Sequence, residues 1–194
     1  MARPDPDILK RAQAGDRDAL DALLRPEMDR VFATCRRMVG SRQDAEELAQ
    51  DALVKVIRGL PTYDGRASLS TWMTRVTINS CLSWMRSRAR KSDQRPISLD
   101  YPDTLAGEPA PVSGVQDDDD TTRPRVERAL EGLKPEHRAI LVLRDVRELD
   151  YEAIGSALDL PIGTVKSRLF RARVALRGVL EEGDRATVDR AEDI

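Results

Sequence analysis

One stretch near the end of the chain, residues 151–180, constrains the fold more than any other. A short helical pattern over residues 151–159 stops at Leu160 and Pro161, and a longer helical pattern starts at Ile162. Two helices joined by so short a break indicate a helix-turn-helix. The second helix has one apolar stripe at helical period, which predicts the side that faces a core: Val165, Leu169, Ala172, Leu176 and Val179.

The other faces of that second helix are basic. Residues 161–180 carry five basic residues and no acidic one. Such a face is typical of a helix that neutralises phosphates, although it can also be solvated or lie on an acidic protein. At about 100° per residue, Ser167 and Phe170 point away from the apolar stripe, with Lys166 and Arg171 beside them, so base edges in a major groove are within reach. The preceding turn and the absence of acids favour DNA.

The charge of the chain is unevenly distributed, and this matters more than its formal net charge of −2. Residues 66–95 carry seven basic residues against Asp93 alone, whereas residues 96–122 carry seven acids and no base. A second acidic segment, residues 181–194, follows the basic helix. Two cationic segments are therefore separated and followed by anionic ones, a pattern that permits nucleic-acid binding.

Several classes of protein are disfavoured by the composition. No apolar run approaches the roughly 20 residues of a spanning helix and the first residues do not resemble a signal sequence, so we expect a cytoplasmic protein without membrane insertion. Cys35 and Cys81 stand alone, and the chain has a single histidine. Neither a zinc site nor a disulfide scaffold is indicated. We expect no metal, no cofactor and no catalytic residues.

The 194 residues predict an all-α protein with two small helical domains. In the first part, residues 7–24 form either two short helices or one bent helix around Gly15. Residues 96–122 lack periodicity and are rich in proline, glycine and acids, which indicates a flexible acidic linker. The predicted organisation is a domain over 1–95, the linker over 96–122, a helix-turn-helix domain over 123–180 and an acidic tail over 181–194. Further helices are expected over residues 27–39, 44–60, 70–91, 123–133 and 136–146.

The predicted helix over residues 44–60 has an acidic outer strip. Asp44, Glu47 and Asp51 recur at helical spacing beside Gln50. The inner stripe of this helix is predicted to be Leu48, Ala52, Leu53, Val56 and Ile57. Three carboxylates could serve a metal or acid–base site, but no histidine or second acidic motif is near, and a solvated face is the simpler interpretation. A docking surface for a basic partner is a third alternative. The residues alone do not rank this docking surface above a solvated face.

The next segment combines aromatic, amide and basic residues. A polar loop bearing Tyr63 leads into a helix with Trp72, Asn79 and Trp84 and a strongly basic end. This mixture suits a nucleic-acid strand whose bases are unstacked. Core packing is the preferred interpretation for each tryptophan taken singly, whereas an asparagine in mid-helix needs a partner or a purpose.

Several segments together resemble one protein family. They are residues 44–56 (DAEELAQDALVKV), Tyr63-Asp-Gly, residues 69–79 (LSTWMTRVTIN), residues 133–138 (LKPEHR) and residues 161–173 (PIGTVKSRLFRAR). Their order and content resemble the extracytoplasmic-function sigma factors of bacterial RNA polymerase, within the sigma-70 family. The resemblance covers nearly the whole chain, so it is more specific than a lone helix-turn-helix.

The resemblance implies a role for each segment. The acidic helix would dock on the clamp helices of core polymerase, through Asp44, Glu47, Leu48, Gln50 and Asp51. The loop and the helix after it would capture a flipped base of the minus-ten element and help open the duplex, through Tyr63, Trp72, Arg75, Asn79, Arg86 and Arg88. The last helix would enter the major groove at the minus-thirty-five element, through Thr164, Lys166, Ser167, Arg168, Phe170, Arg171 and Arg173. The acidic linker would thread toward the RNA exit path.

Two residues depart from the family's usual pattern. Asp51 stands where glutamate is frequent. Lys166 stands where arginine is common, which keeps the charge but loses the two-pronged donor that reads guanine.

The resemblance implies a non-catalytic initiation factor with three partners: core RNA polymerase, promoter DNA and an anti-sigma factor. Two alternatives remain. A sigma mimic would sequester an anti-sigma factor without reading DNA, and its basic helices would be degraded. A stand-alone helix-turn-helix regulator would bind DNA without polymerase and would need neither the base-capturing loop nor the acidic strip.

Overall fold

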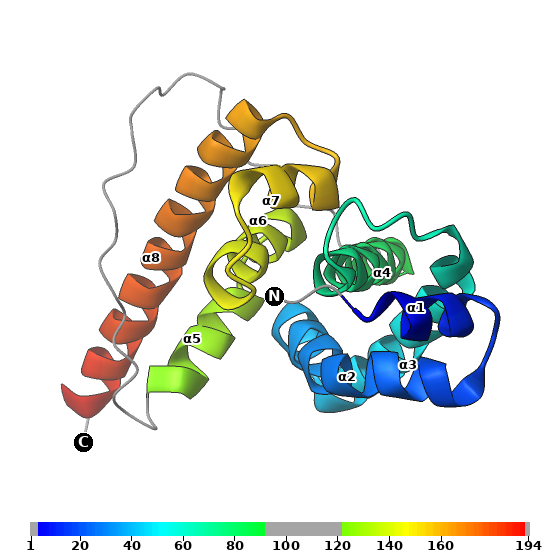
Figure 1. The fold of residues 1–194 in the computed structure, drawn as a ribbon. Helices are drawn as coiled ribbons and strands as arrows, with labels where there is room; N and C mark the ends of the chain where they lie inside the picture. Colours follow the sequence, from blue (N-terminus) through cyan, green and yellow to red (C-terminus); the bar gives the residue numbers. More distant parts are fainter. Residues whose placement is uncertain (1–3, 92–121, 193–194) are drawn as a thin grey trace.

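The computed structural model describes residues 4–91 and 122–192, and the side chains of residues 4–90 and 125–183. Every regular element in these ranges is helical, which confirms the all-α, two-domain prediction. The first domain comprises α1 (Pro6–Gln13), α2 (Arg17–Val39), α3 (Arg42–Gly59), the 3-10 turn η1 (Leu60–Thr62) and α4 (Leu69–Lys91) (Figure 1). The second comprises α5 (Thr122–Glu131), α6 (Pro135–Leu141), the π-helical turn η2 (Val142–Val146), α7 (Tyr151–Leu158) and α8 (Ile162–Glu192). The expected linker over 96–122 lies, except for Thr122, outside the described residues.

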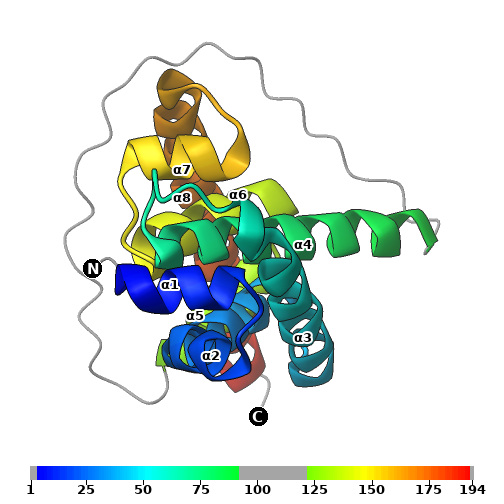
Figure 2. The same ribbon diagram turned by 45° about the vertical axis from the view of Figure 1, so that its right-hand side comes forward.

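The core of the first domain forms where α2, α3 and α4 pack against one another, with α1 lying on α2. The side chains at its centre are almost completely buried: Cys35, Met38, Val56, Met73 and Ile78. Burial of a large apolar side chain contributes about 1.5–3 kcal/mol, so this cluster fixes the three helices relative to one another. The C-terminal half of α4 extends beyond the other helices of the domain (Figure 2).

The expected break in the first helical segment occurs at Gly15, whereas the helix that follows is longer than predicted. Gly15 has a φ of +89°, which suits glycine and separates α1 from α2. α2 then continues through Pro26 to Val39, although separate helices were expected before and after that proline. Ala22, whose carbonyl Pro26 leaves without a donor, is exposed, so water can satisfy that carbonyl.

The second domain also differs from the prediction at one end. α8 does not stop at Leu180 but continues to Glu192, through the segment expected to be an acidic tail. Residues 181–192 contain no proline, and one glycine within a helix is tolerated. The core of this domain lies between α6, α7 and α8 and includes Ile140, Leu143, Ile154, Val165 and Leu169.

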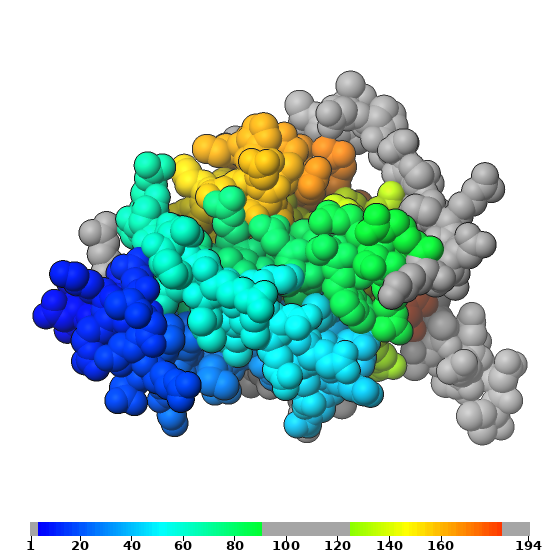
Figure 3. Space-filling model, turned by 90° about the vertical axis from the view of Figure 1, so that its right-hand side faces the viewer, coloured from blue at the N-terminus to red at the C-terminus, as the bar shows by residue number. Residues whose placement is uncertain are grey.

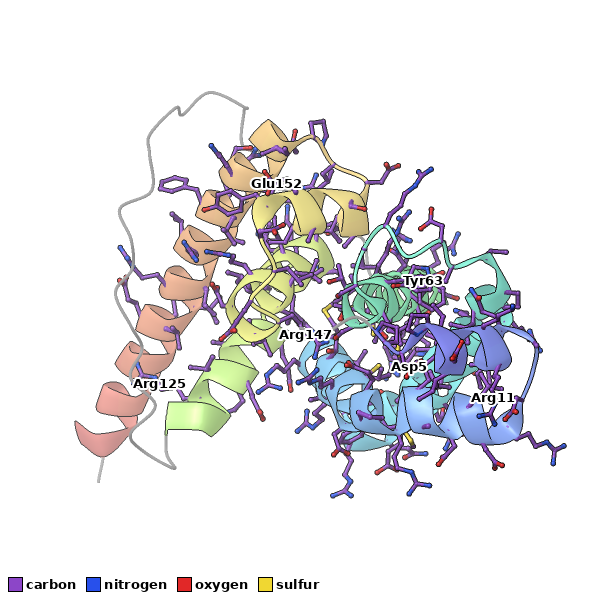
Figure 4. The ribbon with its side chains drawn as sticks, in the orientation of Figure 1. Asp5, Arg11, Tyr63, Arg125, Arg147 and Glu152 are labelled. Atoms are coloured by element: carbon purple, nitrogen blue, oxygen red, sulfur yellow. The ribbon has the colours of Figure 1, made fainter. Side chains whose placement is uncertain are left out.

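The two domains contact each other through two arginines, one buried and one largely buried. Arg147, at the end of η2, lies between the domains (Figure 4) and is 11% exposed. Its guanidinium donates to the hydroxyls of Ser70 (3.1 Å) and Thr74 (2.9 Å) on α4 and lies 3.8 Å from the carboxylate of Glu27 on α2. Arg138 donates to the backbone carbonyl of Met38. Burial lowers the pKa of both guanidinium groups.

Candidate nucleic-acid interface

The helix-turn-helix is built from α7 and α8, and local chemistry sets each of its boundaries. Asp150 caps α7 by accepting a hydrogen bond from the backbone N–H of Ala153 at 2.7 Å. Asp159 ends α7 in the left-handed region with a φ of 55°. In the turn the backbone of Leu160 lies so close to Gly155 that a Cβ on Gly155 would come within 2.8 Å of the Leu160 carbonyl oxygen. The turn therefore requires glycine at position 155.

The predicted apolar stripe of α8 faces the core at its centre. Val165, Leu169 and Ala172 are between 0% and 1% exposed, while Leu176 and Val179 are half-buried. This orientation leaves the basic side of the helix accessible. Of the predicted minus-thirty-five residues, Lys166 is exposed and the others are half-exposed: Thr164, Ser167, Arg168, Phe170, Arg171 and Arg173.

Several of these side chains are oriented by neighbours within the domain. Arg171 donates to the Ser167 hydroxyl at 3.3 Å, one turn earlier on the same helix. Arg173 donates to the carboxylate of Asp145 at 2.9 Å, so part of its charge is already neutralised by η2. The ammonium group of Lys166 lies 6.0 Å from the ring centroid of Tyr151. A weak cation–π attraction at this distance biases the lysine toward the start of α7.

His137 was not among the predicted site residues. It is half-buried on α6, which packs against α8. Burial lowers its pKa, and the positive charges of Lys134, Arg168 and Arg171 lower it further, whereas Glu136 opposes them. The basic surface therefore extends from α8 onto the start of α6. Lys134 and His137 lie in one of the segments that carried the family resemblance, which is the signal that could have revealed them.

Four of the predicted minus-ten residues lie along one face of α4. Trp72, Arg75, Asn79 and Arg86 are spaced three, four and seven residues apart, which places them on one stripe at about 100° per residue. Arg75, Asn79 and Arg86 are exposed, and Trp72 is half-buried at the start of the stripe. The stripe offers two cations, an amide and an aromatic ring, the groups that hold a strand through phosphate contact and base stacking.

Tyr63 supports this stripe from the loop before α4. It is 8% exposed, its hydroxyl donates to the Ala67 carbonyl at 2.7 Å, and its ring lies 5.3 Å from the Trp72 ring with a tilt of 47°. The chain reverses at Gly65, which has a φ of +72°. Ser68 begins α4 by accepting a hydrogen bond from the Thr71 N–H at 3.1 Å. In this state Tyr63 shapes the loop and offers little ring surface for stacking.

Arg88 lies apart from the stripe. Sixteen residues after Trp72, it faces a different side of α4, where it donates to the Asp44 carboxylate on α3 at 3.2 Å. Its guanidinium also lies 5.0 Å from the ring centroid of Trp84. A predicted DNA contact and a predicted polymerase contact are therefore paired with each other. The Arg88 and Asp44 side chains are 65% and 24% exposed, so the pair is weak and either group can exchange partners.

The acidic strip is on the outer surface of α3, which lies beside α4 on one face of the molecule (Figure 3). Glu47, Gln50 and Asp51 are exposed. Leu48 is 3% exposed and belongs to the core, so it supports the helix and presents no surface to a partner. Two apolar residues extend the strip instead, Val54 at 44% and Ile57 at 42% exposed. Ile57 was predicted to face inward, but the domain leaves that side of α3 uncovered.

Other chemistry receives little support from the described residues. Cys35 and Cys81 are fully buried free thiols 3.7 Å apart, and a hydrogen bond between them together with burial raises the pKa of the Cys81 thiol. In the ranges that the structure describes, no cluster of three histidine, cysteine or acidic side chains could hold a metal ion. No helix within those ranges combines the length and apolar character needed to cross a bilayer.

Comparisons with known proteins identify both domains. The family model for Sigma-70 region 2 matches residues 23–91, and that for Sigma-70 region 4 matches residues 123–176. Over 180 residues the chain is 34% identical to the ECF RNA polymerase sigma factor SigE of Mycolicibacterium smegmatis, covering 91% of this chain and 68% of that protein. It is 30% identical over 178 residues to the ECF RNA polymerase sigma-E factor of Escherichia coli K12, covering 87% and 90%.

A solved structure has a similar fold. The sigma factor RpoE of Bartonella quintana, crystallised in complex with the anti-sigma factor NepR, superposes with a TM-score of 0.60 at 26% sequence identity. The match covers 81% of this chain and 94% of that one.

Proposed function

Because this chain belongs to the extracytoplasmic-function sigma factors of bacterial RNA polymerase, we propose that its two exposed basic helices read the two elements of one promoter. In this proposal α8 enters the major groove at the minus-thirty-five element, and the α4 stripe holds the separated strand at the minus-ten element. The outer face of α3 docks on core polymerase. The chain supplies binding energy and no catalytic group, and it acts in the cytoplasm, where core polymerase and the chromosome are.

The observation that carries this proposal is the α4 stripe. Arg75, Asn79 and Arg86 are all exposed on one face although they span three helical turns, and the half-buried Trp72 ends that face beside the loop. A stand-alone regulator that uses only a helix-turn-helix needs no such second surface. A sigma mimic needs neither surface, yet α8 presents its lysine and arginines as well. Extrusion of a base costs a few kcal/mol, which two tethered contacts on one polymerase can supply together.

An anti-sigma factor is a further proposed partner. The support is the Bartonella quintana sigma factor, a protein of similar fold found in complex with an anti-sigma factor.

The proposal is tested with core polymerase and a library of randomised promoters. We expect the chain to associate with core enzyme and to direct initiation to a subset of the library. The double variant Lys166→Ala with Arg171→Ala should retain core association but lose initiation that depends on the upstream element. Two base-edge contacts at the lower end of about 1–3 kcal/mol each amount to a loss of roughly 30-fold or more.

A matched control removes two positive charges elsewhere. Arg17 and Arg25 are both exposed on α2, away from the surfaces assigned here, so Arg17→Ala with Arg25→Ala should leave promoter choice unchanged. The assignment of α8 is wrong if the Lys166 and Arg171 variant loses core association instead. The whole proposal is wrong if the wild-type chain fails to change initiation by core enzyme at any promoter.

A further inference from the structure

A side chain from the first helix holds the loop that precedes α4. The amide nitrogen of Gln13, the last residue of α1, donates to the backbone carbonyls of Leu60 at 3.1 Å and Tyr63 at 3.0 Å. These residues lie 47 and 50 positions away in the sequence. We propose that Gln13 is a positioning residue for minus-ten recognition, acting through this loop; the inference rests on the function proposed above.

The geometry of η1 explains why an amide is suited to this place. Leu60 is the first residue of the 3-10 turn and Tyr63 follows its last, and Tyr63 leaves the turn in an extended conformation with a φ of −70° and a ψ of 118°. A side-chain amide has two N–H groups on one nitrogen, so it can donate to both carbonyls at once. Leu60 is fully buried and Tyr63 is 8% exposed, and the two hydrogen bonds from Gln13 are partly buried, so water replaces a lost donor here only in part.

The loop transmits this anchor toward the α4 stripe. Tyr63 contacts the ring of Trp72, the first residue of the stripe, and its hydroxyl holds the far side of the loop at Ala67. Asp64 accepts a hydrogen bond from the Arg66 N–H at 3.1 Å and so folds the tip of the loop. Gln13 therefore fixes the first residue of an internally bonded loop, and the effect reaches the DNA surface through Tyr63.

α1 itself is firmly attached to the domain, as an anchor must be. Ala12, the residue before Gln13, is 3% exposed against α2, and the Arg11 guanidinium pairs with Asp16 at 2.8 Å across the break between the helices. This helix lies before residue 23, where the match to Sigma-70 region 2 begins. Gln13 is thus a contribution to the loop from outside the segment that the family model describes.

The test uses holoenzyme assembled from core polymerase and the full chain, with a promoter selected by the wild-type protein from a randomised library. The probes are a single-stranded oligonucleotide carrying the minus-ten element of that promoter and a set of oligonucleotides in which one base at a time is replaced by an abasic site. The ratio of their affinities measures base capture. A general loss of stability lowers the affinity for both probes and leaves this ratio unchanged.

Three substitutions of Gln13 and one control give the expected order. Gln13→Met keeps the length of the side chain without its N–H donors, and we expect the ratio at the captured base to fall about fivefold, as loss of donors to two partly buried carbonyls implies. In Gln13→Glu the side chain presents only acceptors to two carbonyls, so the affinity ratio should fall further than in Gln13→Met. Gln13→Asn keeps the N–H donors on a shorter side chain, so its affinity ratio should lie between those of the wild type and Gln13→Met. Lys10→Met, on the exposed side of the same helix, should match the wild type.

The outcomes separate the inference from the function on which it rests. If wild-type holoenzyme shows base capture and the Gln13→Met and Gln13→Asn holoenzymes show the same ratio, Gln13 does not position the loop. A fall in thermal stability with equal losses on both probes also overturns the inference and leaves a purely structural role. If wild-type holoenzyme neither initiates nor discriminates between the probes, the proposed function fails instead.

Discussion

Some side chains predicted to contact a partner are already paired with other side chains of this protein. Asp44 and Arg88 were assigned to different partners, yet they bond to each other across α3 and α4. Arg173, a predicted DNA contact on α8, is already paired with Asp145. Because these exposed pairs are weak, binding of a partner can redirect them without unfolding any element.

Gly155 is a residue whose replacement should disable the helix-turn-helix. In Gly155→Ala the new Cβ would meet the Leu160 carbonyl oxygen at 2.8 Å, and that backbone must move. We expect a loss of about 1–3 kcal/mol in the free energy of unfolding, together with weaker binding to the minus-thirty-five element. Urea unfolding and duplex binding by holoenzyme measure the two effects. Gly163→Ala is the control, since a Cβ there meets nothing within 4 Å; equal behaviour of the two variants would disprove the steric argument.

Helical period predicts which way a residue faces on its own helix, but not what covers that face. The stripe of Val165, Leu169 and Ala172 was predicted correctly because a helix-turn-helix packs both of its helices on one core. Ile57 also had the spacing of an inward residue, and it is exposed because no helix of the domain covers that side of α3. The pairing of Arg88 with Asp44 could not be predicted from the period of α4 either, because it depends on where α3 lies beside α4.

The loop before α4 shows the same limit for non-helical segments. Its glycine and polar residues predicted a turn, and Tyr63 was expected to meet a base. The burial of Tyr63 results from contacts with Trp72, Ala67 and Gln13, residues four to fifty positions away in the sequence. No local pattern encodes such a set of contacts.

The packing of α6 on α8 makes folding of the second domain sensitive to acid. His137 has its pKa lowered by burial and then by Lys134, Arg168 and Arg171, so the folded chain binds a proton less readily there than the unfolded chain. Stability should therefore decrease as pH falls below about 6.5, the ordinary histidine value, until the folded-state pKa is passed.

This sensitivity is measured by urea unfolding at pH 7.5 and at pH 5.5. His137 is the single histidine of the chain, so the difference between wild type and His137→Gln isolates its contribution from that of the carboxylates. The variant should lose less stability than the wild type over this interval. An equal or greater loss in the variant would show that burial of His137 does not penalise its charge.

The two domains pack more closely together than the separation of the two promoter elements would allow. Elements centred at minus ten and minus thirty-five are about 25 base pairs apart, or roughly 85 Å at 3.4 Å per base pair. Here α4 packs directly against α7, the helix that precedes α8. α8 itself, with 31 residues, is about 46 Å long at 1.5 Å per residue. If α4 and α8 bind the two elements as proposed, the contact between α4 and α7 has to open before both are bound.

Arg147 is the residue through which this opening is best measured. Arg147→Ala removes the hydrogen bonds to Ser70 and Thr74 and the ion pair with Glu27, so the domains of the free chain should separate. We expect a larger radius of gyration by small-angle X-ray scattering and faster formation of the promoter complex with core enzyme. Arg25→Ala, on the exposed side of α2, should change neither quantity. An unchanged radius of gyration in Arg147→Ala would mean that other contacts hold the domains together, and slower complex formation would mean that Arg147 serves the open state.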